Sequence, residues 1–127
     1  MAQVSDAQVV GDVMLPNPKT LPWDATVADV RAILANPSVQ LVLLTEGTTF
    51  KGAVANIPAD APSEAFARDY REPNPETIAV SASAATAFDV TARSLYRRVV
   101  VIDEQDTLLG LVCLDQTGTR FCGRKSR

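Results

Sequence analysis

Two adjacent arginines, Arg97 and Arg98, are the residues of this chain best suited to binding an anion. They stand directly before an apolar run at residues 99–102, so a strand there would carry them at its start. Arginine suits a phosphate group because its planar guanidinium donates two parallel hydrogen bonds. The alternative is a solvated pair at a strand edge, which is the more frequent situation of surface arginines. Both interpretations stay open at the level of sequence.

The residues that most enzyme mechanisms need are missing. The sequence contains no histidine, which removes the commonest general base and most transition-metal sites. Its two cysteines, Cys113 and Cys122, cannot hold zinc unaided, and a disulfide between them is not expected in a cytosolic protein. Cys113 is expected to be a small apolar residue of a buried strand. The acidic turn at 103–106 is expected to be solvated, because it makes a poor calcium site. We therefore predict no catalysis and no metal.

Composition indicates a globular protein of 127 residues, 46% hydrophobic and 21% charged. No apolar run approaches the roughly 20 residues of a membrane-spanning helix. The first residues lack a basic region followed by an apolar stretch, so we expect no secretory signal and a cytoplasmic location. The net charge of −3 argues against nucleic acid as a partner. The basic residues after position 119 are interpreted as a solvated tail.

An internal repeat organises the chain. The segment Pro16-Asn17-Pro18-Lys19-Thr20-Leu21 recurs 57 residues later as Pro73-Asn74-Pro75-Glu76-Thr77-Ile78. At Gly52 and Gly110 the spacing is 58, so one residue has been gained between the two copies. The duplication predicts two similar structural units.

Each repeat is expected to fold as strand, helix, strand, strand and short helix. In the first repeat, Thr26 and Asp29 resemble a capping box, and Pro37 ends the helix. In the second repeat, Ser83 caps the helix. The expected paired strands are 41–44 with 50–56 and 99–102 with 108–114, and short helices are expected at 9–14 and 63–70. The predicted domains are a first repeat at 8–70, a second at 71–119 and a basic tail at 120–127.

The duplicated pattern resembles a known family. A Pro-x-Pro-x-Thr-Leu motif enters a helix, a β run ends in Val-Val-Ile-Asp, and Leu-Leu-Gly-Leu-Val follows. Together with the lead-in Gly11-Asp12-Val13-Met14-Leu15-Pro16, this order is similar to a tandem pair of cystathionine-β-synthase-type (CBS) domains, also called a Bateman module. The resemblance covers most of the chain and rests on order and spacing, since no single motif is specific.

The resemblance implies an α/β fold of two β-α-β-β-α repeats with pseudo-twofold symmetry. It implies a stand-alone homodimer that binds AMP, ATP or S-adenosylmethionine in the cleft between the repeats and regulates a partner protein in trans. No cofactor is required. These properties follow from the family and are expectations for this chain.

The resemblance also implies which residues would contact the nucleotide. Thr20 and Thr77 stand where the family places a hydroxyl near the cleft, although each is also suited to satisfying a turn after proline. Arg97 and Arg98 would meet phosphate, and Asp115 would meet ribose. Val99, with Val100, Leu41 and Val42, would line an adenine slot, but core packing is the stronger interpretation for these four. The single tryptophan, Trp23, is expected to be a core or interface anchor.

Both repeats depart from the nucleotide-binding pattern of the family. The family continues after its strand glycine with Gly-h-h-Thr/Ser-x-x-Asp, where h is apolar. Cys113 replaces the hydroxyl after Gly110, and Asp115 is displaced by one residue. After Gly52, Ala55 replaces the hydroxyl. Two functions therefore stay open: a nucleotide-sensing regulatory module, and a structural or dimerisation module that has lost its ligand.

Overall fold

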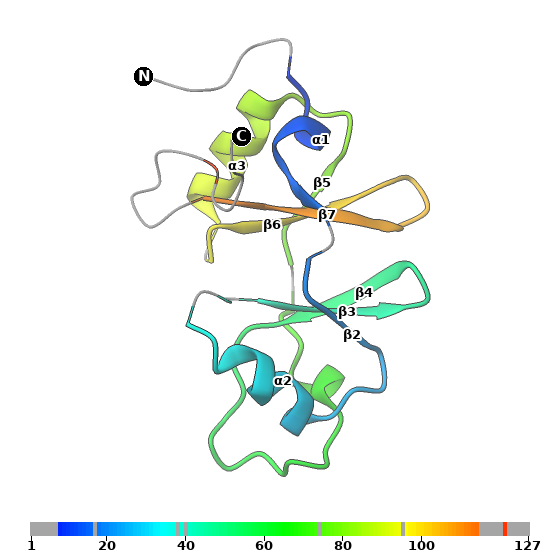
Figure 1. The fold of residues 1–127 in the computed structure, drawn as a ribbon, viewed down its shortest axis with the longest axis vertical. Helices are drawn as coiled ribbons and strands as arrows, with labels where there is room; N and C mark the ends of the chain where they lie inside the picture. Colours follow the sequence, from blue (N-terminus) through cyan, green and yellow to red (C-terminus); the bar gives the residue numbers. More distant parts are fainter. Residues whose placement is uncertain are drawn as a thin grey trace. The chain divides into compact units, whose positions relative to one another are not determined.

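The computed structural model describes residues 8–16, 18–37, 39, 41–73, 75–94, 96–114 and 121. The chain forms two compact units, one for each repeat (Figure 1). The first-repeat unit comprises Lys19–Pro75, and the second-repeat unit comprises Met1–Pro18 with Glu76–Arg127. The N-terminal segment therefore belongs to the second repeat. The domain bounds expected from the sequence repeat stay a prediction.

The first-repeat unit is a three-stranded sheet with two helices. Its strand order is β2 (Thr20–Pro22), β3 (Val42–Glu46) and β4 (Thr49–Val54), with β2 parallel and β4 antiparallel to β3. Helix α2 (Val27–Leu34) and the 3-10 helix η1 (Ala67–Tyr70) contact each other and the sheet (Figure 1). A core of fully buried side chains joins them, namely Val30, Val42, Leu44, Val54 and Ala67. The predicted helix at 63–70 is confirmed in its second half, as a 3-10 turn.

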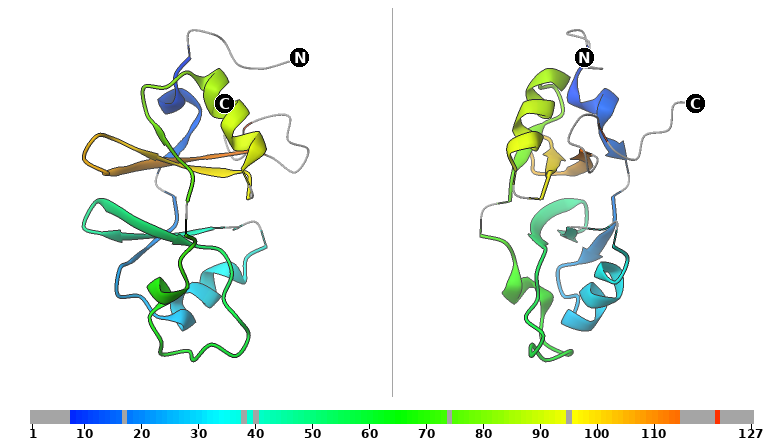
Figure 2. Two further views of the ribbon diagram at one scale, coloured as in Figure 1. Left: turned by 180° about the vertical axis from the view of Figure 1, so that it is seen from behind. Right: turned by 90° about the vertical axis from the view of Figure 1, so that its left-hand side faces the viewer.

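The second-repeat unit repeats this plan with one extra strand. Its order is β1 (Leu15–Pro16), β7 (Leu108–Cys113), β6 (Arg98–Ile102) and β5 (Thr77–Ala79). Helices α1 (Val10–Val13) and α3 (Ala84–Arg93) lie side by side in both views of Figure 2. They cover a core of Val10, Ala87, Val99, Val101 and Val112. The predicted hairpin and N-terminal helical turn are confirmed.

Side-chain caps start the two longer helices as the sequence predicts. The Thr26 hydroxyl accepts the main-chain N–H of Asp29 at 3.3 Å, and the Asp29 carboxylate accepts that of Thr26 at 3.0 Å. The Ser83 hydroxyl accepts the main-chain N–H of Thr86 at 3.0 Å. Both caps satisfy N–H groups that have no partner within the helix. No helix among the described residues has the length and apolar character needed to span a membrane.

The duplication extends to individual hydrogen bonds. Ala67 donates its main-chain N–H to Ala25 at 2.9 Å, and Val10, 57 positions earlier, donates to Ala82 at 2.8 Å. Two further bonds match in the same way: Val27 N–H to Ala65, and Ala84 N–H to Gln8. Helix α1 thus closes the second-repeat unit as η1 closes the first. The sequence repeat did not predict that α1 packs with the second repeat. Periodicity indicates which local structure a segment forms, but not which distant segment it packs against.

The gained residue lies in the hairpin turn. The first hairpin turns through two residues between Glu46 and Thr49, whereas the second turns through Glu104, Gln105 and Asp106. Gly47 has φ of 64° and Asp106 has φ of 63°, so each turn uses one residue in the left-handed region. Aspartate tolerates this region better than most side chains. Two of the three residues of this longer turn, Glu104 and Asp106, are acidic.

Candidate functional site

Thr77 and Arg98 lie on the same face of the four-stranded sheet. Thr77 is paired with Val100 across the parallel strands β5 and β6, and Arg98 is two positions before Val100. Side chains two positions apart share a face, and so do paired residues of neighbouring strands. The residues that follow Thr77 and Arg98, which are Ile78 and Val99, belong to the core beneath α1 and α3. The two Cα atoms are therefore roughly 8 Å apart on the face away from the helices.

Arg98 is held by the backbone that precedes it. One guanidinium nitrogen, Nη1, donates to the carbonyl oxygens of Tyr96 and Arg97, each at 3.2 Å. The main-chain N–H of Arg98 donates to the Ser94 hydroxyl at 3.1 Å. The side chain is half-buried, and this burial lowers the pKa of the guanidinium from its ordinary value. Arginine stays charged at neutral pH, so Arg98 is an oriented cation on this face.

Arg97 stands where strand β6 meets the end of β7. It is exposed, with φ of 53°, a left-handed conformation that is uncommon for this residue type. Its carbonyl oxygen accepts the main-chain N–H of Leu114 at 3.2 Å. Asp115 follows Leu114 in the sequence, but it lies outside the described residues. The structure thus brings the backbone of Arg97 to the residue before Asp115 and leaves a contact with Asp115 as a prediction.

The other predicted contact residues have different surroundings. Val99 is fully buried in the core under the helices, where it packs with Val101 and Val112. Its side chain is thus on the face opposite Thr77. Thr20 is exposed at the start of β2 and is paired with Leu43. The position that matches Arg98 in the first repeat is Leu41, which is 8% exposed. Only the second repeat therefore combines the threonine with an arginine.

Cys113 corrects one expectation. It lies opposite Arg98 in the β6–β7 ladder and is 3% exposed, as a buried strand residue should be. However, it is disulfide-bonded, so the expectation that no disulfide forms is wrong. Composition indicates the cellular compartment only indirectly and cannot exclude a disulfide. Cys122 lies outside the described residues. A sulfur atom occupies the position where the family pattern has a hydroxyl.

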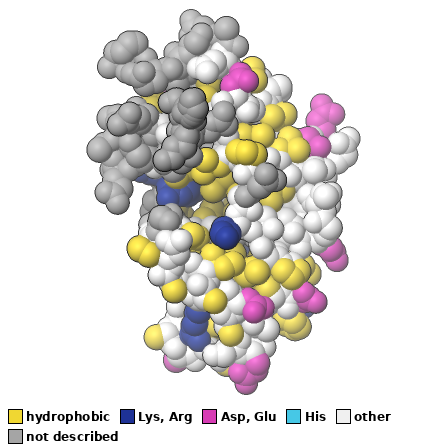
Figure 3. All heavy atoms as spheres, viewed as in Figure 1, with side chains coloured by type: hydrophobic (Ala, Val, Ile, Leu, Met, Phe, Trp, Pro, Cys, Tyr) yellow, Lys and Arg dark blue, Asp and Glu magenta, His cyan; other side chains and the backbone are white. Residues whose placement is uncertain are grey.

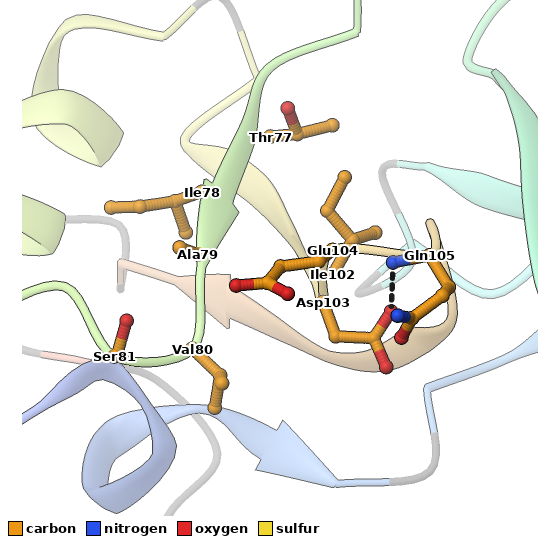
Figure 4. Close-up of a pocket in the computed structure, with 9 residues that line it drawn as sticks. All are labelled: Thr77, Ile78, Ala79, Val80, Ser81, Ile102, Asp103, Glu104 and Gln105. Atoms are coloured by element: carbon orange, nitrogen blue, oxygen red, sulfur yellow. Dashed lines mark hydrogen bonds between the residues drawn. The ribbon is translucent and has the colours of Figure 1, made fainter.

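A cavity of about 440 Å³ opens at the far end of the same two strands (Figure 4). It lies between the end of β5 and the acidic hairpin turn, and Thr77 belongs to its lining. In Figure 4 the Glu104 carboxylate extends from the turn toward Ala79. The complete lining is Thr77, Ile78, Ala79, Val80, Ser81, Ile102, Asp103, Glu104 and Gln105. The described residues of this lining include two carboxylates and no basic side chain, so it suits a neutral or cationic group better than a phosphate.

Asp103 fixes the shape of this turn. Its Oδ1 atom accepts the main-chain N–H groups of Gln105 and Thr107, each at 2.9 Å. These bonds, led by the one from Thr107, lower the pKa of the Asp103 carboxyl because they favour its charged form. Sequence reasoning interpreted this carboxylate as solvated and missed its role. An aspartate four residues before a threonine, across a turn, was the available signal.

Basic side chains are scattered over one face of the molecule (Figure 3). On the face drawn in Figure 3, Lys and Arg side chains appear at separate places and form no continuous stripe among the described residues. A stripe of that kind is the usual feature of a nucleic-acid-binding face. Within the described ranges, no three His, Cys, Asp or Glu side chains are grouped so that they could hold a metal ion.

Comparison with known proteins agrees with this architecture. Residues 67–116 match the CBS domain family. The structure is similar to that of CBSX2, a CBS-pair protein from Arabidopsis thaliana, with a TM-score of 0.72 and 18% identity over 84% of this chain and 88% of that one. It is also similar to CBSX2 in complex with AMP, with a TM-score of 0.71 and 19% identity over 89% and 93% of the two chains.

A third similar structure is the CBS domain of a bacterial CNNM/CorC family Mg²⁺ transporter in complex with ATP. Its TM-score is 0.65, with 16% identity over 85% of this chain and 82% of that one. A search of curated proteins found no match. Residues 67–116 thus match the CBS domain family, and over both repeats the chain has the α/β fold of a CBS-domain pair.

Proposed function

We propose that this protein is a regulatory module that binds an adenosine-containing nucleotide at its second repeat. The observation that carries the proposal is the placement of the Thr77 hydroxyl and the Arg98 guanidinium on one sheet face. Two structures with the same fold are complexes with AMP and ATP. AMP, ATP and S-adenosylmethionine are the candidate ligands, and none of them is a required cofactor.

In this proposal Arg98 binds phosphate, because its guanidinium has donors beyond the nitrogen that contacts Tyr96 and Arg97. Arg97 adds a second positive charge at the start of the strand. Thr77 donates or accepts a hydrogen bond with the nucleoside, and Asp115 accepts one from ribose. Thr20 has the corresponding role in the first repeat. Val99 contributes through the strand that it stabilises.

A specific observation favours the alternative of a ligand-free structural or dimerisation module. Leu41 replaces the arginine in the first repeat, and Cys113 occupies the position of the expected hydroxyl in the second. A module that keeps its fold and loses its ligand would show these replacements. We keep nucleotide binding as the first proposal, because Thr77 and Arg98 remain together.

Thermal unfolding with and without nucleotide tests the proposal, since a ligand that prefers the folded state raises the melting temperature. Protein shown to be free of bound nucleotide is titrated with AMP, ATP, S-adenosylmethionine and adenosine, and calorimetry supplies the affinities. The informative variant is Arg98→Leu, because the first repeat has leucine at this position. This variant should bind AMP roughly tenfold more weakly or worse, and its affinity for adenosine should be unchanged. Thr77→Val should weaken both.

Arg93→Gln is the matched control, since it removes one positive charge from an exposed position on α3. It should bind AMP as the unsubstituted protein does. No response to any of the four compounds would overturn nucleotide binding. A response that Arg98→Leu leaves intact would show that the ligand binds elsewhere.

The remaining properties are proposed on the same basis. The module regulates a partner in trans and forms a homodimer, so sedimentation should give twice 13.6 kDa. We propose no enzymatic activity and no binding of nucleic acid or membrane. The proposed cytoplasmic location requires the sulfur of Cys113 to be reduced in the cell, because the cytosol disfavours disulfides. Rapid alkylation of cell lysates followed by mass spectrometry would test its state.

A further inference from the structure

A cluster of three cations surrounds the single tryptophan in the first-repeat unit. The Nζ atom of Lys51 is 5.7 Å from the centre of the Trp23 ring, and the Cζ atoms of Arg68 and Arg71 are 5.4 and 5.0 Å from it. Arg68 also lies 4.1 Å from the ring centre of Phe66, which is 43% exposed. We call these five residues the Trp23 cluster.

The second repeat shows that the fold does not require this charge. At the matching positions it has Val80 for Trp23, Met14 for Arg71 and Leu109 for Lys51. These three side chains pack against the core of the second-repeat unit. Gly11 and Val9 match Arg68 and Phe66. At these matching positions the second-repeat unit has apolar side chains, whereas the first-repeat unit has cations around an indole ring.

Arg68 and Arg71 are oriented, and neither has a carboxylate partner among the described residues. Arg71 donates to the carbonyl oxygen of Arg68 at 3.0 Å, and Arg68 donates to that of Trp23 at 3.5 Å. Among the described residues, only Lys51 of this cluster has an ion pair, with Glu46 at 3.9 Å. Backbone carbonyls and ring faces therefore hold both guanidinium groups in place and leave other donors available. Preorganised arginines of this kind suit carboxylates, which they bind bidentately.

We propose that the Trp23 cluster is a docking surface for an acidic peptide segment of a partner protein. Charge complementarity supports this occupant, because two arginines that form no ion pair within the described part of the chain concentrate positive charge on a protein whose net charge is −3. The exposed Phe66 ring adds an apolar contact for a side chain between the carboxylates. Guanidinium groups already lie near the indole ring, so a stacked nucleic-acid base would have to displace them.

Trp23 is the only tryptophan, so its fluorescence reports directly on the cluster. The probe is a short peptide that repeats Glu-Glu-Leu, with a Gln-Gln-Leu peptide as the neutral control. Binding is followed by the anisotropy of the labelled peptide and by Trp23 emission, without nucleotide. The acidic peptide should saturate both signals, the neutral peptide should leave them unchanged, and salt should weaken the interaction.

The informative variant is Lys51→Leu with Arg71→Met, which introduces the residues of the second repeat. It should fold, as circular dichroism will show, and bind the acidic peptide about tenfold more weakly or worse. Arg93→Gln, which removes a charge from the other unit, should bind as the unsubstituted protein does. Equal binding by the double variant, or no saturable binding by the acidic peptide, would overturn the proposal. Displacement of the peptide by inorganic phosphate or an oligonucleotide at lower concentration would assign the surface to that anion instead.

Discussion

Val10 donates its main-chain N–H to the carbonyl oxygen of Ala82 at 2.8 Å and so ties the N-terminal segment to the second repeat. Its side chain is fully buried and belongs to the core of that unit. The first repeat obtains the same closure from Ala67, which follows it in the chain. Each unit is therefore completed by a short helix, which comes from the end of the first-repeat unit's own segment in one case and from the N-terminal segment in the other.

Val10→Ala should lower the free energy of unfolding of the second-repeat unit by about 2 kcal/mol, because it removes buried methyl groups and leaves a cavity. Urea denaturation followed by circular dichroism measures the change. Val9→Ala is the matched control, since Val9 is the neighbour of Val10 and its own side chain is 38% exposed. It should cost at most about 0.5 kcal/mol. Equal losses in the two variants would contradict the proposed role of α1.

Thr91→Val should stabilise the protein by about 1 kcal/mol. Thr91 is fully buried on α3, and its hydroxyl has no hydrogen-bond partner among the residues that the structure describes. Valine has nearly the same shape and avoids the cost of an unsatisfied hydroxyl. Thr86→Val, on the exposed side of the same helix, should give no gain, because Thr86 receives a hydrogen bond from Ser83 at 2.9 Å. A stabilisation shared by both variants would reflect helix propensity or general hydrophobicity instead.

Gly110→Ala should destabilise the folded protein more than Gly52→Ala does, although the two glycines occupy matching positions in the two repeats. A methyl group on Gly110 would come within 2.8 Å of the Leu15 carbonyl oxygen, which β-sheet pairing holds in place. A methyl group on Gly52 would meet the flexible side chain of Arg71 at 2.5 Å. We expect a loss of about 2–3 kcal/mol for Gly110→Ala and about 1 kcal/mol or less for Gly52→Ala. Denaturant midpoints will rank them, and the reverse order would contradict the described contacts.

The hairpin turn should lose stability in acid. Hydrogen bonds lower the pKa of Asp103 in the folded state, so its contribution is fully present above the ordinary value of 3.8 and is lost as pH falls through the lowered one. Asp103→Asn keeps an acceptor oxygen that cannot be protonated in this range, so stability should vary less with pH. Urea denaturation across the acid range measures this slope. Asp60→Asn, at an exposed carboxylate, should leave it unchanged. An unchanged slope for Asp103→Asn would exclude the turn as an acid-sensitive element.

Local patterns predicted most elements of the fold. The structure confirms the caps at Thr26 and Ser83 and the strand predicted at 99–102, each of which depends on neighbouring residues. It also confirms the repeat spacing of 57 in matching hydrogen bonds of the two units. The spacing of 58 at Gly110 indicated one gained residue, which lies in the second hairpin turn. Helix α2 ends at Leu34, three residues before the proline that was expected to end it. Helix ends are less strongly encoded than helix starts when no side-chain cap is present.

Features that depend on contacts between distant segments were not predicted from the sequence. The pairing of Thr77 with Val100 needs the register of two parallel strands, which periodicity does not fix. Trp23 was expected to be a core or interface anchor, and its cation neighbours come from β4 and η1. Alignment of the two repeats would have exposed the contrast between Arg71 and Met14. The cavity beside Asp103 had no sequence signal beyond the acidic turn itself.

Because the N-terminal helix α1 packs with the second-repeat unit, the two units become complete at different times during synthesis. Residues 19–75 contain every strand and helix of the first-repeat unit, so that unit can be completed as soon as this stretch has left the ribosome. Residues 8–16 must wait for their partner strand, because Leu15 pairs with Leu111. At about 5–20 residues per second, this delay lasts roughly 5–20 seconds. During that interval the face of α1 that is buried in the folded unit, which includes Val10 and Val13, has no sheet to cover it.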